Sequence, residues 1–111
     1  MPTVTVSNKL AENLEKKDRR YIVVDLASCK TCGGAVSEVF ARLAKDAEID
    51  GLDGTERRFP CVDEQGAPLL IGGANVEMVV INRFVRIGEK VRIDLRRFLG
   101  VADIAIEGAE F

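Results

Sequence analysis

The sequence predicts an α+β fold, in which two helices of the N-terminal half pack on a mostly antiparallel sheet that ends in a C-terminal hairpin. Three patterns predict it: helical spacing of apolar residues early, alternating apolar and charged residues late, and a polar, glycine-rich stretch between them. A chain of 111 residues is the usual size of one domain, so we expect a single compact unit over 1–111.

The first elements follow from short patterns. Residues 3–6 alternate threonine with valine, which predicts a short strand. Ser7 can cap a brief helix in which Leu10 and Leu14 share one face. Residues 21–26 form an apolar, β-branched run, which is typical of a strand in the middle of a sheet.

The second helix is predicted over about residues 33–48. The spacing of Val36, Phe40, Leu43 and Ala47 places them on one helical face, and charged residues occupy the other faces.

The rest of the chain predicts a loop followed by strands. Residues 50–68 carry two prolines and many polar residues, so we expect a long loop that is functional or held in place by another group. Residues 76–81 predict a buried strand, and 85–95 a hairpin that turns at 88–90. A last strand is expected around 102–106.

Composition excludes several classes of function. The chain is 47% hydrophobic and 31% charged with a net charge of −2, which is typical of a soluble globular protein and gives no general attraction to nucleic acid. It contains no histidine, which excludes Ser-His-Asp and Cys-His catalysis within the chain. No apolar run predicts a membrane span or a signal peptide, and three cysteines are an odd number, so we expect a reducing cytoplasm and no membrane association.

The segment Cys29-Lys30-Thr31-Cys32-Gly33-Gly34 carries the strongest chemical signal. Two cysteines separated by two residues can place both sulfurs on one metal ion, and the following glycine permits the sharp turn this requires. The segment from Cys29 to Gly33 resembles the knuckle of zinc-ribbon and rubredoxin-type sites. The resemblance implies a ligand geometry for metal.

A structural zinc ion needs four ligands, and the loop supplies candidates for the other two. Cys61 gives a third thiolate, and Glu64 or Asp63 can give a carboxylate, with water or a partner protein as other sources of the fourth ligand. We therefore predict a zinc site of Cys29, Cys32 and Cys61 with Glu64 or Asp63 that holds the loop in place. An iron–sulfur cluster is a weaker candidate because clusters generally use four cysteines, although two subunits can share one.

Two other interpretations of the cysteines stay open. A strand, a Cys-x-x-Cys and a helix together resemble the local layout of thioredoxin-like proteins, which implies a thiol–disulfide oxidoreductase with Cys29 as nucleophile and Cys32 as resolving thiol. Alternatively, all three cysteines are inert, small apolar residues.

The predicted function is a zinc-binding accessory subunit or interaction module of a larger assembly, without catalytic activity of its own. The apolar strand at 76–81 needs more cover than two helices supply, so we expect a protein partner or a homo-oligomer. Arg86, Arg92 and Arg96 are predicted on one outer face of the C-terminal hairpin, facing solvent or an anionic group.

Overall fold

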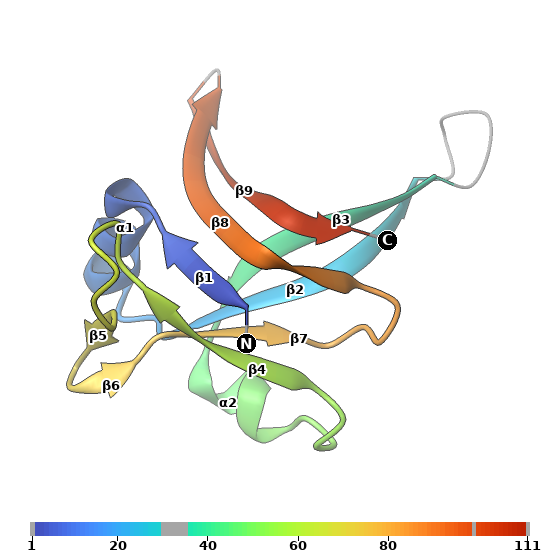
Figure 1. Ribbon diagram of the computed structural model, residues 1–111, viewed down its shortest axis with the longest axis horizontal. Helices are drawn as coiled ribbons and strands as arrows, with labels where there is room; N and C mark the ends of the chain where they lie inside the picture. Colours follow the sequence, from blue (N-terminus) through green and yellow to red (C-terminus); the bar gives the residue numbers. More distant parts are fainter. Residues whose placement is uncertain (1, 30–35, 99, 111) are drawn as a thin grey trace.

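The computed structural model describes residues 2–29, 36–98 and 100–110. The described residues are mostly β-structure, so the α+β prediction is wrong: one long sheet curls into a nearly closed barrel, with two helices beside it (Figure 1). The helices are α1 (Asn8–Lys17) and α2 (Asp46–Asp50). The strands are β1 (Thr3–Val6), β2 (Tyr21–Cys29), β3 (Val36–Ala44), β4 (Arg57–Val62), β5 (Leu70–Ile71), β6 (Ala74–Asn75), β7 (Glu77–Val80), β8 (Arg86–Phe98) and β9 (Val101–Glu110).

The long sheet has the strand order β3-β2-β7-β4-β1-β8-β9. Three neighbouring pairs are parallel (β2–β7, β4–β1 and β1–β8) and three are antiparallel, so the sheet is mixed rather than mostly antiparallel. Its two outer strands, β3 and β9, lie side by side and nearly close the barrel, but no ladder joins them in the part of the chain that the structure describes (Figure 1). β5 and β6 form a separate small hairpin.

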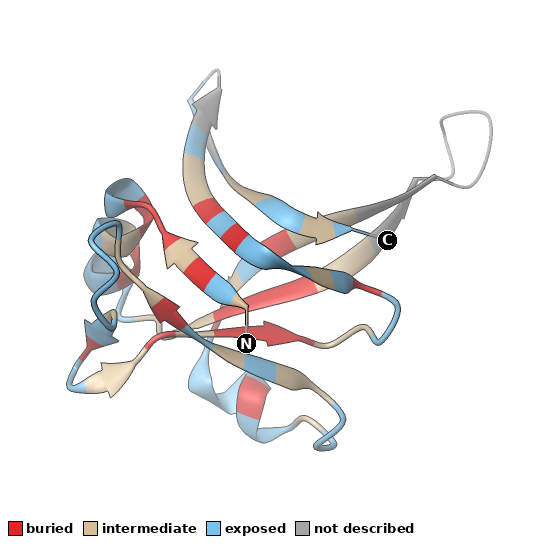
Figure 2. Cartoon of the chain, viewed as in Figure 1, coloured by how far each residue is buried: buried red, intermediate tan, exposed pale blue. Residues whose placement is uncertain are grey.

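One apolar core fills the barrel, and every long strand contributes to it (Figure 2). Alternate residues of each strand point inward, as the period of two in a strand requires. The largest fully buried side chains of the core come from α1, β2, β7 and β8. They are Leu10, Leu14, Ile22, Met78 and Ile93.

The predicted helix over 33–48 is wrong. Residues 36–44 form β3 and pair with β2 along its whole length, and only α2 is helical in this region. The sequence fits both the helical period of 3.6 residues and the strand period of two. Val39 and Leu43 alternate with Phe40 and Arg42, as a strand requires. As a strand, residues 36–44 supply hydrogen-bond partners to the backbone groups along one edge of β2, which a helix cannot do.

The predicted loop over 50–68 contains a strand. β4 pairs with β7 through residues 57–60 and then with β1 through Cys61 and Val62. The two pairings use opposite edges of β4, which lies between β7 and β1 in the sheet. β4 thereby joins the two regions of the sheet.

The predicted hairpin over 85–95 is also wrong, because β8 continues through the expected turn and pairs with β9. The register shifts between Ile87 and Arg92, so the expected turn at 88–90 is an irregularity within one long strand. Gly108 of β9 lies opposite this irregularity with a φ of 90°.

The prediction for the first helix is confirmed. Ser7 is the N-cap of α1, and its hydroxyl oxygen accepts a hydrogen bond from the Leu10 amide at 3.3 Å. The Ser7 amide donates to the Ile93 carbonyl at 2.9 Å, which attaches the start of α1 to β8. Leu10 and Leu14 then face the barrel core together.

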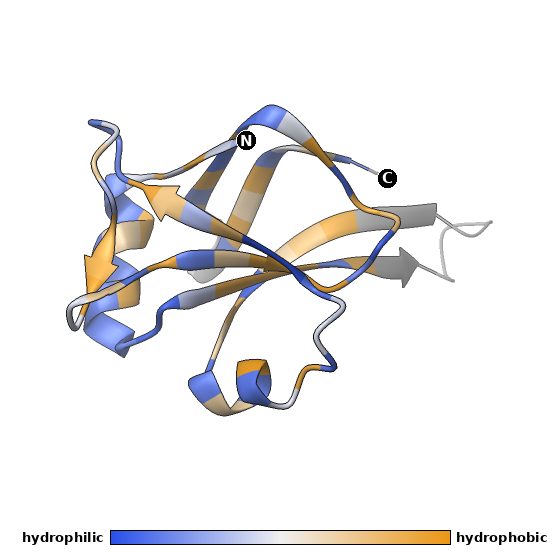
Figure 3. Ribbon diagram, turned by 60° about the horizontal axis from the view of Figure 1, so that its bottom comes forward, coloured by the Kyte–Doolittle hydropathy of each residue, from blue (hydrophilic) through white to orange (hydrophobic). Residues whose placement is uncertain are grey.

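The chain itself covers the apolar strand β7, which removes one reason for expecting a partner. Met78 and Val80 face the barrel core. Val79 faces outward and packs with Val23, Ala44 and Ile49, so that α2 covers this part of the outer face (Figure 3).

We expect Gly108→Ala to lower the free energy of unfolding by at least about 2 kcal/mol. A Cβ at this position would lie 2.1 Å from the Lys90 carbonyl oxygen, and the φ of 90° disfavours any L side chain. Gly51→Ala is the control, because its φ is −83° and a Cβ there meets ordinary contacts at 3.6 and 3.7 Å. Urea unfolding followed by circular dichroism measures both. Equal, small effects of the two substitutions would contradict the described register.

Candidate functional site

Cys61 lies inside the barrel, where its thiol is fully buried. Its amide donates to the Val76 carbonyl at 2.8 Å, and its carbonyl accepts from the Leu69 amide at 3.1 Å. Burial raises the pKa of the Cys61 thiol to about 12, which keeps it protonated at neutral pH. Cys61 therefore behaves as a small core residue.

Cys29 is the last residue of β2, and its backbone pairs with Val36. Only the backbone of Cys29 is described, and Cys32 lies outside the described residues. β2 pairs with β7 only as far as Val24, so its last part continues with β3 beyond the end of that ladder (Figure 1). The predicted pairing of Cys29 and Cys32 on one metal ion stays a prediction.

The structure does not bring Cys61 to Cys29. Cys61 pairs with Val76, and the next residue, Glu77, bonds to Arg20 at the start of β2. Cys29 stands at the other end of that strand. At 3.2–3.4 Å per residue, β2 extends roughly 25–30 Å from its start, beside Cys61, to its end at Cys29. A zinc–sulfur bond is only about 2.3 Å long.

The two predicted carboxylate ligands have other partners. Asp63 accepts hydrogen bonds from the amides of Gln65, at 2.9 Å, and Ala67, at 3.0 Å, and thereby closes a turn. Glu64 accepts from Arg92 of β8 at 2.7 Å. These contacts hold the loop in place, which is the role that the sequence assigned to zinc. Among the described residues, no three cysteine, aspartate or glutamate side chains are grouped to bind a metal ion.

The redox interpretation loses the helix on which it depended. A helix N-terminus lowers the pKa of a nearby thiol, but residues 36–44 are a strand. A mechanism in which α-helical partial charge activates Cys29 is therefore not supported by the described fold.

The arginines of β8 face acidic residues of the same protein. Arg92 stands opposite Glu107 of β9 as well as bonding to Glu64, and Arg96 contacts Glu107 at 3.4 Å. Glu64 of the loop and Glu107 of β9 therefore supply anionic partners for these arginines. No local pattern of β8 could show this.

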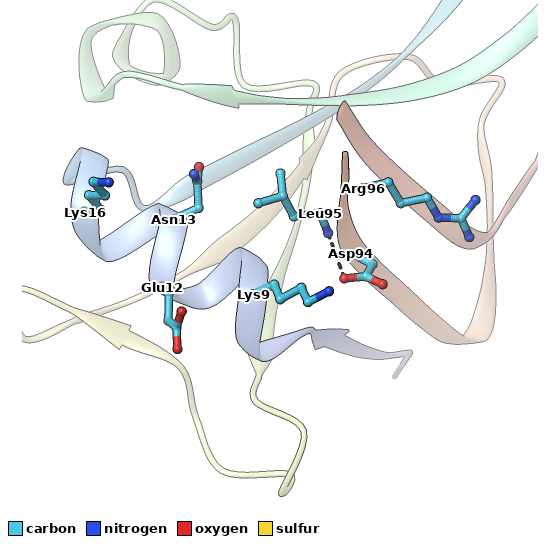
Figure 4. A pocket seen from close by; sticks show the side chains of 7 residues that line it. All are labelled: Lys9, Glu12, Asn13, Lys16, Asp94, Leu95 and Arg96. Carbon is cyan, nitrogen blue, oxygen red and sulfur yellow. Dashed lines mark hydrogen bonds between the residues drawn. The ribbon is translucent and has the colours of Figure 1, made fainter. Parts of the chain in front are cut away.

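A cleft of about 730 Å³ lies between α1 and β8 (Figure 4). The helical period places Lys9, Asn13 and Lys16 along one side of α1, and this side faces the cleft. Figure 4 shows Lys9 extending toward Asp94, whose carboxylate also accepts from the Leu95 amide at 2.8 Å. The lysine spacing was visible in the sequence, but the strand facing it was not.

A second cavity of about 420 Å³ adjoins the first and shares Asn13 and Leu95 with it. It lies where the two outer strands of the barrel meet, lined by residues 41–43 of β3 and by Asp103 and Ile104 of β9. We call the two cavities together the α1 cleft. Sequence reasoning missed this site because it depends on the meeting of β3 and β9, far apart in the chain.

No family model matches this chain, and neither the curated proteins nor the solved structures contain a significant match to it. Among the described residues, no helix is both long and apolar enough to cross a membrane.

We expect Cys61 to stay unreactive toward a thiol reagent at about pH 8 in the folded protein, because its pKa of about 12 and its burial leave almost no accessible thiolate. Counting thiols with Ellman's reagent before and after guanidinium addition measures this. In Cys61→Ala the thiol that appears only on unfolding should be lost. Rapid modification of Cys61 in the native protein would contradict its placement.

Asp94 should contribute to stability in a pH-dependent way. A hydrogen bond from the Ser7 hydroxyl lowers the pKa of Asp94 below its ordinary value. Since the folded-state pKa is the lower one, the stabilisation is present above the ordinary carboxyl pKa of about 3.9 and is lost as the pH falls through the folded-state value.

We therefore expect Asp94→Asn to cost less than about 1 kcal/mol at neutral pH, with solvent screening limiting the effect, and still less near pH 2. Urea unfolding at the two pH values tests this. In a Ser7→Ala background the same substitution should have a smaller effect. A cost that is equal at both pH values would contradict the role of the carboxylate.

Proposed function

We propose that this chain is a small zinc-binding interaction module, an accessory subunit that works in a cytoplasmic assembly and is not catalytic on its own. One observation carries the proposal: the β2–β3 ladder continues to Cys29↔Val36, past the end of the β7 ladder, so that the Cys-x-x-Cys segment joins two strands at the end of an extended hairpin. Cys29 and Cys32 would supply two of the four ligands of a tetrahedral zinc site.

The remaining ligands come from another molecule in this proposal. Cys61, Glu64 and Asp63 lie elsewhere or have other partners, as described above. A partner protein or a second copy of this chain would then complete the coordination, and zinc would hold the two together. Zinc held by two thiolates of one molecule and two ligands of another would act as a cross-link.

The fold supports a binding role more than an oxidoreductase role. The strand after the cysteines supplies no helix dipole to activate a thiol. The reducing cytoplasm assumed in the proposal also favours thiolates that bind metal over a disulfide.

The test is metal analysis of the reduced, tag-free chain by mass spectrometry, together with size-exclusion chromatography and light scattering before and after zinc addition. Zinc bound at one ion per chain or per pair of chains is expected, and either Cys29→Ser or Cys32→Ser should abolish it. Cys61→Ala is the control and should retain the metal, since its thiol is buried in the barrel.

Two results would overturn the proposal. One is the absence of zinc binding by the unmodified, reduced chain. The other is equal zinc binding by the Cys29→Ser/Cys32→Ser double variant. A stable Cys29–Cys32 disulfide that cycles under cytosolic redox conditions, without metal, would replace the proposal with the oxidoreductase function.

A further inference from the structure

We propose that the α1 cleft binds an acidic, extended peptide segment of a partner protein. The proposal concerns a surface other than the cysteine segment: the cleft is lined by residues 41–43 of β3, whereas Cys29 pairs with the opposite end of that strand. It does not depend on zinc.

Charge is unevenly distributed over the molecule, and the residues that line the cleft carry a net positive charge. Among the residues that the structure describes, seven cationic and four anionic side chains line its two cavities. Since the whole chain has 16 cationic and 18 anionic residues, nine cations and fourteen anions are left for the rest of the protein. An acidic protein thus carries a cleft of net charge +3, which attracts acidic ligands.

Several cations of the cleft already have partners within the protein. Arg42 bonds to Glu48 at 2.6 Å, and Arg19 donates to the Lys17 carbonyl at 3.0 Å at the end of α1. Arg96 contacts Glu107 at 3.4 Å. The charges of Arg42 and Arg96 are therefore partly neutralised.

The lysines differ from the arginines. The ammonium groups of Lys9, Lys16, Lys17 and Lys45 form no ion pair or side-chain hydrogen bond within the part of the chain that the structure describes. Lys16 and Lys17 suit the negative end of the α1 dipole, but Lys9 lies in the first turn, where a positive charge is unfavourable. All four lysines are exposed, so their side chains are accessible to a ligand.

Apolar groups between the charges favour a peptide over a simple anion. Leu43, Leu95 and Ile104 belong to the barrel core but are only partly buried where they line the cleft. An extended segment with alternating acidic and apolar side chains fits this lining, since it can place carboxylates beside the lysines and apolar side chains against these three residues.

Nucleic acid fits the cleft less well. No aromatic side chain of the described residues lines it for base stacking, and its four carboxylates would repel phosphates. A peptide can place neutral or basic residues opposite those carboxylates.

The probe is a fluorescein-labelled synthetic peptide of about ten residues that alternates glutamate with valine, the length of a long strand. A copy with glutamine in place of glutamate and an oligothymidylate of about ten nucleotides are the comparison ligands. Fluorescence anisotropy with the full chain measures the binding. We expect the glutamate peptide to bind at least about tenfold more tightly than either comparison ligand, and its affinity to fall as salt rises from about 0.05 M to 0.5 M.

The variant Lys16→Glu/Lys45→Glu reverses two charges of the cleft and should weaken the glutamate peptide by about tenfold or more. The matched control is Arg83→Glu/Lys90→Glu, which makes the same change in net charge at two exposed residues outside the cleft and should alter the affinity less than about twofold. Circular dichroism establishes that both variants are folded. In ¹⁵N-labelled protein, the amide shifts caused by the peptide should gather in residues 9–19 and 41–45.

Four results would overturn the proposal: no binding of the glutamate peptide, equal binding of the glutamine peptide, tighter binding of the oligonucleotide, or equal losses in the two variants. The Cys29→Ser/Cys32→Ser variant should bind the peptide normally. Failure of the zinc proposal and failure of this one are therefore separate results.

Discussion

The four-residue strand β1 is the link on which the barrel depends. It pairs in parallel with β4 on one side and with β8 on the other, and no other strand joins the two parts of the sheet in the described chain. Val4 and Val6 point into the core, and the chain then enters α1 through the cap at Ser7, which is bonded to both Leu10 and Ile93. The position of this short strand therefore brings α1 against the core, closes the sheet and encloses Cys61.

The sequence predicted the elements whose signals are local. Alternation found β1 and β9, the serine cap and two leucines found α1, and β-branched runs found β2 and β7. It failed where two periods fit the same residues, as in β3, and where a strand depends on distant partners, as in β4. In both cases the backbone of a neighbouring strand needed hydrogen bonds, and this demand overrode the local preference of the segment.

In the candidate sites, too, the sequence predicted what depends on local spacing and missed what depends on distant partners. The Cys-x-x-Cys spacing identified Cys29 and Cys32, and they remain the proposed zinc ligands. Cys61 and Glu64 looked similar in the sequence, but a buried position on β4 and an ion pair with Arg92 give them other roles. The α1 cleft was not predictable, because its charges come from a helix and from strands at both ends of the sheet, and only the closed barrel brings them together.

The parallel pairing of β1 with β8 also constrains how the chain folds. Val4 pairs with Val91, so the barrel cannot close until two segments that lie far apart in the sequence have met. Until they meet, the apolar faces of β2, β3 and β7 lack the cover that the closed sheet gives them. Pairing of such distant segments slows folding and lengthens the period of exposure to aggregation.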